Sequence, residues 1–475
     1  MRPGAWPGTH DACAVERAPA VFRRLWAQRA ATNLLEKSHS RCFRLAPAHF
    51  TPTRRGSDRR AHDALPPKSS SPCLARISFV ATLPFEQARQ VVIAQVGQAP
   101  LPPTEELPLE EAGWRVLAEP VVADRDYPPV ARSIRDGYAV RSQDLPGRLR
   151  VVAELRAGQS YNRPVGPGEA VAIMTGAPVP EGADQVVMVE YTTQSGAEII
   201  TDRPPRPGEF INPQGSEARK GEVLLEPGVR LDYSRIALLA MVGKQRVKVY
   251  RRPLVAILPT GDEVVPVDVE PSPYQVRNSN AYSLATQVAR QGGLPWVVGI
   301  APDTYDATRQ LLEQALQADL ILLSGGVSMG KYDLVKDVLR DLGAELYFDH
   351  VLIQPGYPTV FGRVRGKFFF GLPGNPVSTM VTFKLFAQAA LQTLEGERQL
   401  ELPLLPARLT APFRHQTGRT RFWPARLSAD GTEVTPLRWQ GSSDVVAVAR
   451  ANVFLVADAD RQEWQAGETI RVLLK

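Results

Sequence analysis

The 475-residue chain has few cysteines, few histidines and no long hydrophobic run. Its three cysteines all lie in the first 77 residues, at Cys13, Cys42 and Cys73. The rest of the chain therefore has no disulfide framework and no cysteine-ligated metal, and a reducing cytoplasm is the expected compartment. Outside that segment the only histidines are His350 and His415, which argues against zinc, serine and cysteine hydrolases. Apolar runs such as 254–258 are far shorter than the ~20 residues of a membrane helix.

The chain also has little excess of either charge outside its N-terminal segment. Residues 1–77 contain 14 Lys/Arg against 5 Asp/Glu, whereas the remainder contains 42 against 45. The body is slightly acidic, and we expect no nucleic-acid partner. Residues 1–77 show no sustained period, which indicates a disordered basic extension or an over-long gene start. Their Arg-rich, acid-poor composition also fits an organellar transit peptide, and this alternative stays open.

Proline (42) and glycine (36) are abundant but dispersed, so they indicate many turns between short elements. Apolar spacing predicts a first helix over 84–97 and another over 231–242 with Asp232 as its N-cap. Short strands with Gly/Pro turns predict a β-rich domain over 125–215. We assign residues 78–124 and 216–252, which contain a strand over 245–253, to a linking domain.

Residues 253–397 alternate between strands and helices. The expected strands span 254–260, 296–300, 319–324 and 367–371, and the expected helices span 281–293, 306–317, 332–343 and 377–394. This order is typical of a parallel sheet with crossover helices. Residues 398–475 return to short strands and predict a barrel-like C-terminal β domain. The fold class is therefore multidomain, with a central α/β domain flanked by two β domains.

Four unusual segments follow the strands of the expected parallel sheet. They span residues 260–263, 301–303, 324–333 and 371–376. Because parallel strands end at one edge of a sheet, and ligands bind at that edge, we expect these segments to meet in one site.

The glycine-rich segment 324–330 has the composition of an oxyanion site. Its glycines allow the backbone to approach a ligand, and its amides, with the N-terminus of the next helix, can hold a phosphate. Ser324 and Ser328 add hydroxyl donors. The alternative is a tight strand-to-helix turn that binds nothing.

Three aspartates follow strands at the same expected edge: Asp262, Asp303 and Asp333. Each taken singly fits an N-cap or a turn. Taken together, and beside an oxyanion site, they favour a hard cation such as Mg²⁺.

The segment 372–376 predicts a rigid turn in which Asn375 caps a helix that Pro376 opens. Two prolines around Gly-Asn at a ligand-binding edge indicate a fixed wall against a planar ligand. In the β-rich domain the segments 135–139 and 174–177 have an unusual composition for strands and are candidate functional segments, although a turn explains each of them singly.

With these segments in view, the sequence resembles the molybdopterin molybdenumtransferase family (bacterial MoeA and the gephyrin E domain). The resemblance runs from about residue 78 to the C-terminus, and many segments in one order make it specific. They are RDGYAVR, IMTGAPVPEGAD, RPLVAILPTGDE, VRNSNAY, SGGVSMGKYD, IQPGYPTVFG, GLPGNPVS and QGSSD.

The resemblance implies a cytoplasmic transferase of molybdenum cofactor biosynthesis. Adenylylated molybdopterin and molybdate would bind, the pyrophosphate-type bond would be hydrolysed with release of AMP, and molybdenum would pass to the dithiolene with Mg²⁺ assisting. It also implies a homodimer whose cleft lies between the molybdopterin-binding parallel-sheet domain of one subunit and the β-rich domain of the other. The upstream adenylyltransferase is a further candidate partner, and no membrane is expected.

The resemblance also assigns roles to residues. Those in catalytic roles would be Asp136, Thr175, Glu190 and Asp333. The metal ligands would be Asp262 and Asp333. The pterin nucleotide would contact Asp262, Ser279, Asn280, Asp303, Ser324, Gly325, Gly326, Ser328, Gly330, Pro373, Gly374, Asn375 and Pro376.

The chain departs from the family pattern in two places. Arg135 stands where Met is usual, and His350, Gln354 and Tyr357 stand where Lys is frequent, so a weaker affinity for anions is expected. Arg132 or Arg135 are candidates to compensate.

Two rival hypotheses remain. A molybdopterin adenylyltransferase-like nucleotide enzyme would not need the two β domains. A non-catalytic, gephyrin-like scaffold would tolerate loss of Asp136 and Asp333.

Overall fold

The computed structural model describes residues 82–326 and 334–475. The predictions for the extension 1–77, for Ser328, Gly330 and Asp333, and for the start of the helix over 332–343 lie outside the described residues. Within the described residues, no helix combines the length and the apolar character needed to cross a bilayer.

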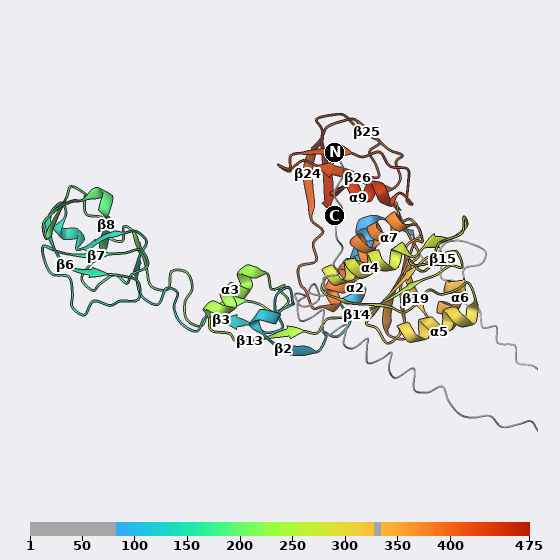
Figure 1. The fold of residues 1–475 in the computed structure, drawn as a ribbon, viewed down its shortest axis with the longest axis horizontal. Coiled ribbons are helices and arrows are strands. Elements are labelled where there is room, and N and C mark those ends of the chain that lie inside the picture. The colour runs from blue at the N-terminus through green and yellow to red at the C-terminus, as the bar shows by residue number, and fades with distance from the viewer. Residues whose placement is uncertain (1–81, 327–333) are drawn as a thin grey trace, which may run out of the picture. The chain divides into compact units, whose positions relative to one another are not determined.

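The β-rich domain is built on one six-stranded sheet (Figure 1). Its strands, in spatial order, are β8 (Gln185–Met188), β5 (Gly137–Val140), β7 (Glu169–Ile173), β6 (Gly147–Leu155), β10 (Glu198–Thr201) and β9 (Thr193–Ser195). Successive residues of β5 point to opposite faces, so Tyr138 and Ala139 enter two separate small cores. The short 3-10 turns η4 (Ser142–Asp144) and η5 (Val189–Tyr191) complete the domain.

Paired strands join sequence segments on either side of the β-rich domain. These pairs are β2 (Thr104–Pro108) with β13 (Arg246–Tyr250), β3 (Val121–Val122) with β12 (Val223–Leu225), and β4 (Arg132–Ser133) with β11 (Ile211–Asn212). The turn η3 (Leu109–Glu111) and the helix α3 (Tyr233–Met241) pack on them. Asp232 caps α3 as predicted, because its carboxylate accepts the backbone amides of Ser234 and Arg235.

The central sheet has four parallel strands where they were predicted, except that β17 lies at 294–297 and not at 296–300, and two strands that were not predicted. Its order is β17 (Leu294–Val297), β14 (Leu254–Pro259), β18 (Leu320–Ser324), β23 (Lys367–Leu372), β22 (Val360–Val364) and β19 (Glu345–Phe348). The first four run parallel, whereas β22 is antiparallel to both β23 and β19.

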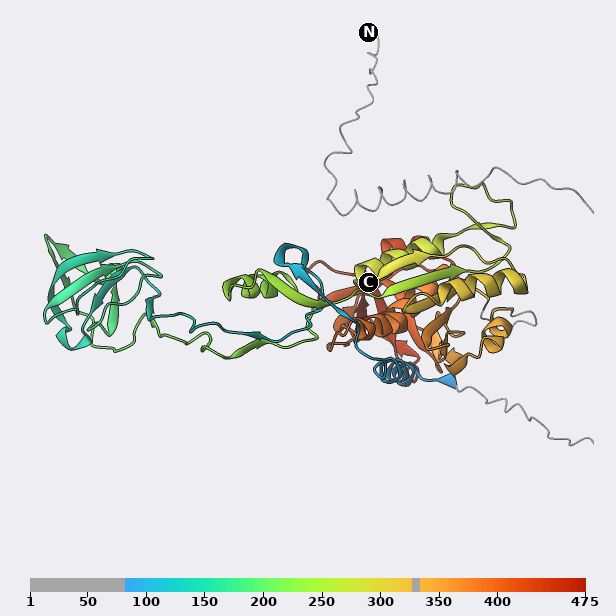
Figure 2. The ribbon, with the colours of Figure 1, turned by 90° about the horizontal axis from the view of Figure 1, so that it is seen from below.

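Helices cover both faces of this sheet (Figure 1). One face carries α4 (Ser279–Arg290), α7 (Pro376–Thr382), η6 (Phe383–Ala387), α8 (Gln388–Leu394) and α2 (Phe85–Val96), which packs against α8 (Figure 2). The other carries α5 (Tyr305–Ala315) and α6 (Leu334–Asp341). Alternation along β18 sends Leu320 and Leu322 to the first core and Ile321 and Leu323 to the second. The helix predicted over 377–394 is correct in extent but contains one π-helical turn, η6.

The C-terminal domain is a closed barrel, as predicted. Its strands are β26 (Thr420–Leu427), β27 (Glu433–Pro436), β24 (Leu404–Leu409), β30 (Thr469–Leu474) and β28 (Val453–Ala457), and β28 pairs back with β26. The sequence did not reveal β21 (Ile353–Gln354), which joins this sheet from outside, or the short helix α9 (Val445–Arg450). The remaining short strands are β1 (Thr82–Leu83), β20 (His350–Val351), β15 (Val264–Val265), β16 (Val276–Arg277), β25 (Phe413–Arg414) and β29 (Glu463–Trp464).

An ion cluster with an unusual carboxyl group lies at the end of α8. Glu395 is 4% exposed and bonds the guanidinium of Arg230, which also contacts Glu397 at 2.7 Å. Burial raises the pKa of Glu395 to about 7, because the loss of hydration outweighs the attraction of Arg230. The folded protein therefore binds this proton more tightly than the unfolded chain does.

We expect the stability contributed by this group to fall as the pH rises. It is fully present below the ordinary pKa of 4.5 and is lost as the pH passes the folded value of about 7. Glu395→Gln lacks this titration. Between pH 5 and pH 8 the free energy of unfolding of the parent should therefore fall by about 2 kcal/mol relative to that of the variant. Urea unfolding at several pH values measures the difference. The exposed control Glu401→Gln should show none, and a pH-independent difference for Glu395→Gln would contradict the assignment.

Candidate active site

A cleft with a volume of about 690 Å³ opens at the carboxyl ends of β14, β18 and β23. A volume of this size suits a small-molecule ligand. The lining residues are Pro259, Thr260, Gly261, Glu263, Val264, Val276, Arg277, Asn278, Ser279, Asn280, Asp303, Ser324, Gly325, Gly326, Pro358, Pro373, Gly374, Asn375, Pro376 and Ser443.

The cleft brings together most of the predicted nucleotide contacts that the structure describes. They are Ser279, Asn280, Asp303, Ser324, Gly325, Gly326, Pro373, Gly374, Asn375 and Pro376. Asp262 lies next to the cleft in the chain but does not line it. Segments far apart in sequence therefore meet at one edge of the sheet, as the parallel topology requires.

The glycine turn after β18 is packed tightly between its neighbours. Gly325 and Gly326 have φ angles of +97° and +61°, a region that favours glycine. A Cβ atom on Gly325 would lie 2.8 Å from the carbonyl oxygen of Thr260. The Gly325 amide donates to the carbonyl of Leu372 at 3.1 Å, so it is not available to a ligand. The predicted oxyanion cradle therefore depends on the rest of the segment.

Asn280 ties three walls of the cleft together. Its Nδ2 donates to Ser324 Oγ at 2.8 Å and to the carbonyl of Gly374 at 2.7 Å. These bonds link the N-terminus of α4 to the end of β18 and to the turn after β23. Its Oδ1 is buried and has no partner among the described residues, and the same holds for Thr260 Oγ1. Unpaired buried oxygens are costly in a protein interior, so they mark places where a ligand or water completes the bonding.

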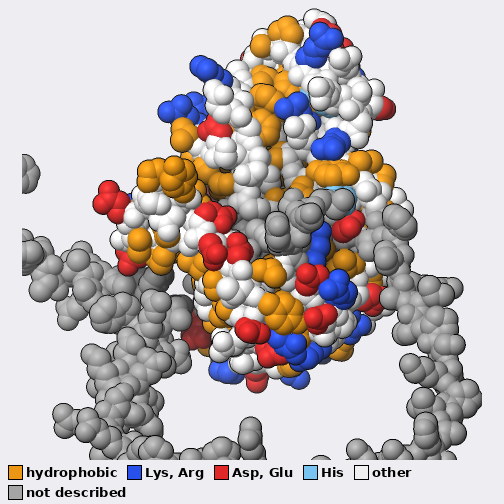
Figure 3. Space-filling model, turned by 90° about the vertical axis from the view of Figure 1, so that its right-hand side faces the viewer, with side chains coloured by type: hydrophobic (Ala, Val, Ile, Leu, Met, Phe, Trp, Pro, Cys, Tyr) orange, Lys and Arg blue, Asp and Glu red, His pale blue; other side chains and the backbone are white. Residues whose placement is uncertain are grey.

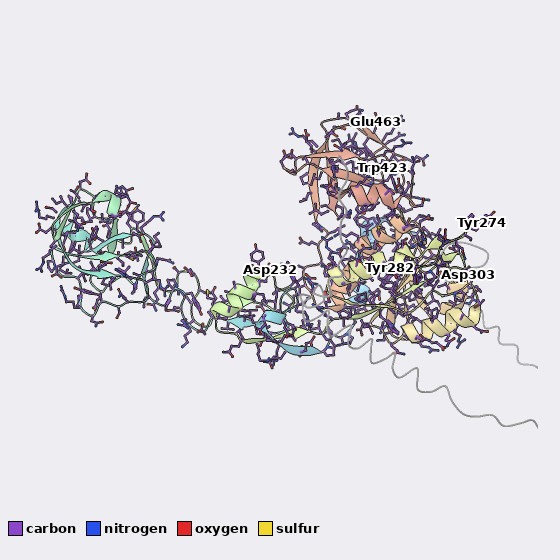
Figure 4. The ribbon with its side chains drawn as sticks, in the orientation of Figure 1. Asp232, Tyr274, Tyr282, Asp303, Trp423 and Glu463 are labelled. Carbon is purple, nitrogen blue, oxygen red and sulfur yellow. The ribbon has the colours of Figure 1, made fainter. Side chains whose placement is uncertain are left out.

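Two carboxylates, Glu263 and Asp303, line the cleft; Asp303 is labelled in Figure 4. Asp262 contacts the second of them: its Oδ1 accepts the backbone amide of Asp303 at 2.9 Å. This bond connects the loop after β14 to the loop after β17. Asp262 is therefore placed to position Asp303, and Glu263 is a lining residue that the sequence reasoning missed although it lies in the quoted TGDE segment.

The donor set fits Mg²⁺ bound jointly with a substrate. The described residues contain no group of three or more His, Cys, Asp or Glu that could hold a metal by themselves. Magnesium in phosphate-handling enzymes is commonly held by one or two carboxylates together with substrate phosphates. Glu263 and Asp303 provide such oxygens.

The C-terminal domain closes one side of the cleft. Asn375 is the N-cap residue of α7, as predicted, but its side chain does not cap the helix. Instead its Nδ2 donates to Ser442 Oγ at 2.9 Å, next to the lining residue Ser443. Among the described residues that line the cleft, Arg277 is the only Lys or Arg. Arg277, Asn278 and Ser443 were missed, although they lie in the quoted segments VRNSNAY and QGSSD.

Two cations at the start of strand β26 lie beside the segment that lacks the family's lysines: Arg419, which directly precedes the strand, and Arg421, which lies on it. The guanidinium of Arg419 lies 4.0 Å from the ring centre of Tyr357. Gln354 pairs with Arg421 in the parallel β21–β26 ladder. His350 is buried and bonds Asp349 through Nδ1 at 2.8 Å. Neither Arg419 nor Arg421 forms an ion pair with a carboxylate in the described part of the chain.

The predicted catalytic residues of the β-rich domain form an exposed group of their own. Asp136 Oδ1 accepts the Thr175 amide at 2.6 Å and the Thr175 hydroxyl at 2.8 Å. These two bonds, the amide first, hold the pKa of Asp136 below its usual value. The Val189 amide donates to the Asp136 carbonyl at 3.2 Å, which brings the turn containing Glu190 alongside. No residue of 125–215 lines the cleft.

On the molecular face shown in Figure 3, acidic, basic and apolar side chains are interspersed over the lower part of the described surface. This mixture matches the near balance of charge in residues 78–475.

Comparisons with known proteins agree with this architecture. Three family descriptions match in order: MoeA N-terminal region (domain I and II) at residues 83–243, probable molybdopterin binding domain at 256–393, and MoeA C-terminal region (domain IV) at 406–475. The molybdopterin molybdenumtransferase of Nostoc sp. is 40% identical over 78% of this chain and 88% of its own length. That of Bacillus subtilis is 34% identical over 78% of this chain and 90% of its own.

A solved structure shows the same fold. The molybdopterin biosynthesis moeA protein from Pyrococcus horikoshii is similar with a TM-score of 0.64 at 33% identity, covering 83% of this chain and 99% of that one. The chain therefore belongs to the MoeA family of molybdopterin molybdenumtransferases and is a transferase of molybdenum cofactor biosynthesis.

Proposed function

We propose that the chain moves molybdenum from molybdate to the dithiolene of molybdopterin, using adenylylated molybdopterin as substrate and releasing AMP. The observation that carries the proposal is the cleft at the carboxyl edge of the parallel sheet. It combines phosphate-binding polar groups, two carboxylates and a rigid proline-flanked wall in one volume of about 690 Å³.

The lining residues suggest how the substrate is held. Pro373 and Pro376 form a rigid surface for the planar pterin, and Arg277 supplies positive charge for phosphate. The unpaired oxygens of Asn280 and Thr260 accept donors from the ligand. Water adds to the adenylyl phosphorus, the bond from that phosphorus to the bridging oxygen breaks, AMP leaves, and the pterin keeps its own phosphate. The two dithiol protons leave with a molybdate oxygen as water when the two Mo–S bonds form.

Glu263 and Asp303 are the residues that would hold Mg²⁺, with Asp262 positioning Asp303 and Asp333 as a further ligand expected from the family resemblance. When bound, the cation would reduce the negative charge on the phosphates. Asp136, whose pKa is lowered, remains a carboxylate at neutral pH and can orient a water or a substrate group without first losing a proton.

We further propose that the working unit is a homodimer with shared clefts. The cleft contains none of Asp136, Thr175 and Glu190, yet these residues form an exposed group around the Asp136 carboxylate. A second subunit can bring that group to the cleft. A cytoplasmic location suits the absence of cysteine from residues 78–475.

Incubation with adenylylated molybdopterin, Mg²⁺ and molybdate tests the reaction. AMP should appear in a molybdate-dependent manner, in step with molybdenum bound to the pterin. In a parallel incubation with molybdopterin, ATP and Mg²⁺, consumption of ATP with formation of adenylylated molybdopterin would instead indicate an adenylyltransferase. Absence of turnover in both incubations would favour the scaffold hypothesis.

Because Arg419 and Arg421 stand beside the positions of the missing lysines, we expect them to supply charge for molybdate. Arg419→Gln should weaken molybdate binding about tenfold, the typical effect of losing one charged hydrogen bond. Isothermal titration calorimetry measures it, with the exposed Arg408→Gln as control. Adding Gln354→Lys to the Arg419→Gln variant should recover part of the lost molybdate affinity. Unchanged molybdate affinity in Arg419→Gln would show that this cation has no such role.

A further inference from the structure

A second cavity, of about 460 Å³, lies between α4, the α7–η6–α8 helix and α9. It shares no lining residue with the cleft, and the proposed reaction uses none of its side chains. Its walls are mainly apolar and include Met380, Phe383, Val448 and Phe454. Tyr282 of α4 lies at its exposed side (Figure 4). Its volume is in the range of small-molecule sites.

Positive charge in this cavity is not balanced by acidic side chains. Arg290, Lys384 and Lys475 all line it, and no Asp or Glu does. None of the three forms an ion pair with a carboxylate of the described residues. Burial lowers the pKa of Lys384 and of Lys475, and the charge of Arg290 lowers both further. Lys475 Nζ donates to the carbonyl of Val448 at 2.9 Å, which fixes it at the wall.

A buried amide adds an independent sign of a ligand. Gln388 is 7% exposed and lines the cavity, and its Oε1 has no hydrogen-bond partner among the described residues. Buried amide oxygens are paired in nearly all proteins, by protein, water or ligand. A buried acceptor without a donor, next to cations without an ion-pair partner among the described residues, is best explained by a bound molecule. That molecule would offer an anionic acceptor to the cations and an N–H or O–H donor to Gln388.

We propose that this cavity binds a small amphipathic anion, with one carboxylate or sulfonate head and an apolar body that carries an N–H or O–H donor for Gln388 Oε1. The head neutralises Arg290, Lys384 and Lys475, while the body packs on Phe383 and Phe454. A metal cation is disfavoured by the like charges, and a nucleic acid by the apolar walls and small volume.

The probe 8-anilino-1-naphthalenesulfonate, an apolar anion, tests the proposal. Its fluorescence should rise saturably with one site per chain, and decanoate should displace it, whereas the uncharged decan-1-ol should do so at least about tenfold less well. Lys384→Gln and Arg290→Gln should each weaken probe binding about tenfold. Arg450→Gln, on α9 but outside the lining residues, is the matched control and should bind as the parent does.

A filling variant separates ligand binding from loss of folding. Ala449→Trp keeps all three cations and should abolish probe binding by occupying the space. Its thermal unfolding and its AMP release should match the parent. Unchanged probe affinity in the Arg290→Gln/Lys384→Gln double variant overturns the proposal. A second result would also overturn it: the dimer dissociates when Arg290 and Lys384 are substituted, and decanoate does not displace the probe from the parent. The cavity would then be covered by a second copy of the chain and not by a small anion.

Discussion

Asp136→Asn is expected to lower the rate of AMP release by about 10²- to 10⁴-fold while the protein stays folded. Asparagine keeps an oxygen that can accept the two bonds from Thr175, so the loop geometry survives. The substitution removes only the negative charge, at an exposed position. The loss should appear in kcat rather than in thermal stability, because the charge is needed at the reacting group.

The measurement is single-turnover AMP release, with cofactor production in a deficient strain as a second readout. Asp202→Asn, an exposed aspartate of the same domain, is the matched control and should retain full activity. Full activity and full complementation by Asp136→Asn would remove this residue from the catalytic set and favour the scaffold hypothesis.

Asn280→Asp should reduce kcat/KM by about 10²-fold or more, the second large effect. The amide donates to Ser324 Oγ and to the Gly374 carbonyl, and a carboxylate can donate to neither. The Ser324 hydroxyl can rotate and donate to the new carboxylate, but the bond to the Gly374 carbonyl is lost and becomes a repulsion between two acceptors. This loss, together with a negative charge placed beside the expected phosphate site, accounts for the size.

A role in assembling the cleft is separable from general stability. Asn375→Ala removes a single bond to Ser442 and should have a smaller effect on kcat/KM. Both variants should unfold within a few degrees of the parent. If Asn280→Asp retained normal kinetics, the convergence of α4, β18 and the turn after β23 would not be the substrate site.

The parallel strands, the helix cap at Asp232 and the convergence of the strand-end segments could be predicted from sequence, because each depends on local periodicity or on topology. Strand β18 is a continuous apolar run, as a strand buried on both faces must be. Strands β22 and β19 were not predicted. β22 forms a hairpin with β23 through Arg365 and Gly366, a local signal that the sequence reasoning missed, whereas the edge strand β19 pairs with β22 across the segment 349–359.

Side-chain partners inside the site were harder to predict than its location. Asn375 occupies the predicted cap position, yet its amide bonds Ser442 from the barrel domain. Asp262, which is predicted to bind metal, also accepts the Asp303 amide through Oδ1, a contact that the sequence did not indicate. Both choices depend on which loops meet in space, which no local pattern encodes.

The most direct test of a shared active site mixes the two inactive variants. In a heterodimer of Asp136→Asn with Asn280→Asp, one of the two clefts combines an intact Asn280 with an intact Asp136 from the partner. Random exchange of subunits should restore about a quarter of the parent's AMP release. No recovery, in a mixture shown to contain heterodimers, would mean that each subunit supplies both residues and would contradict the shared cleft.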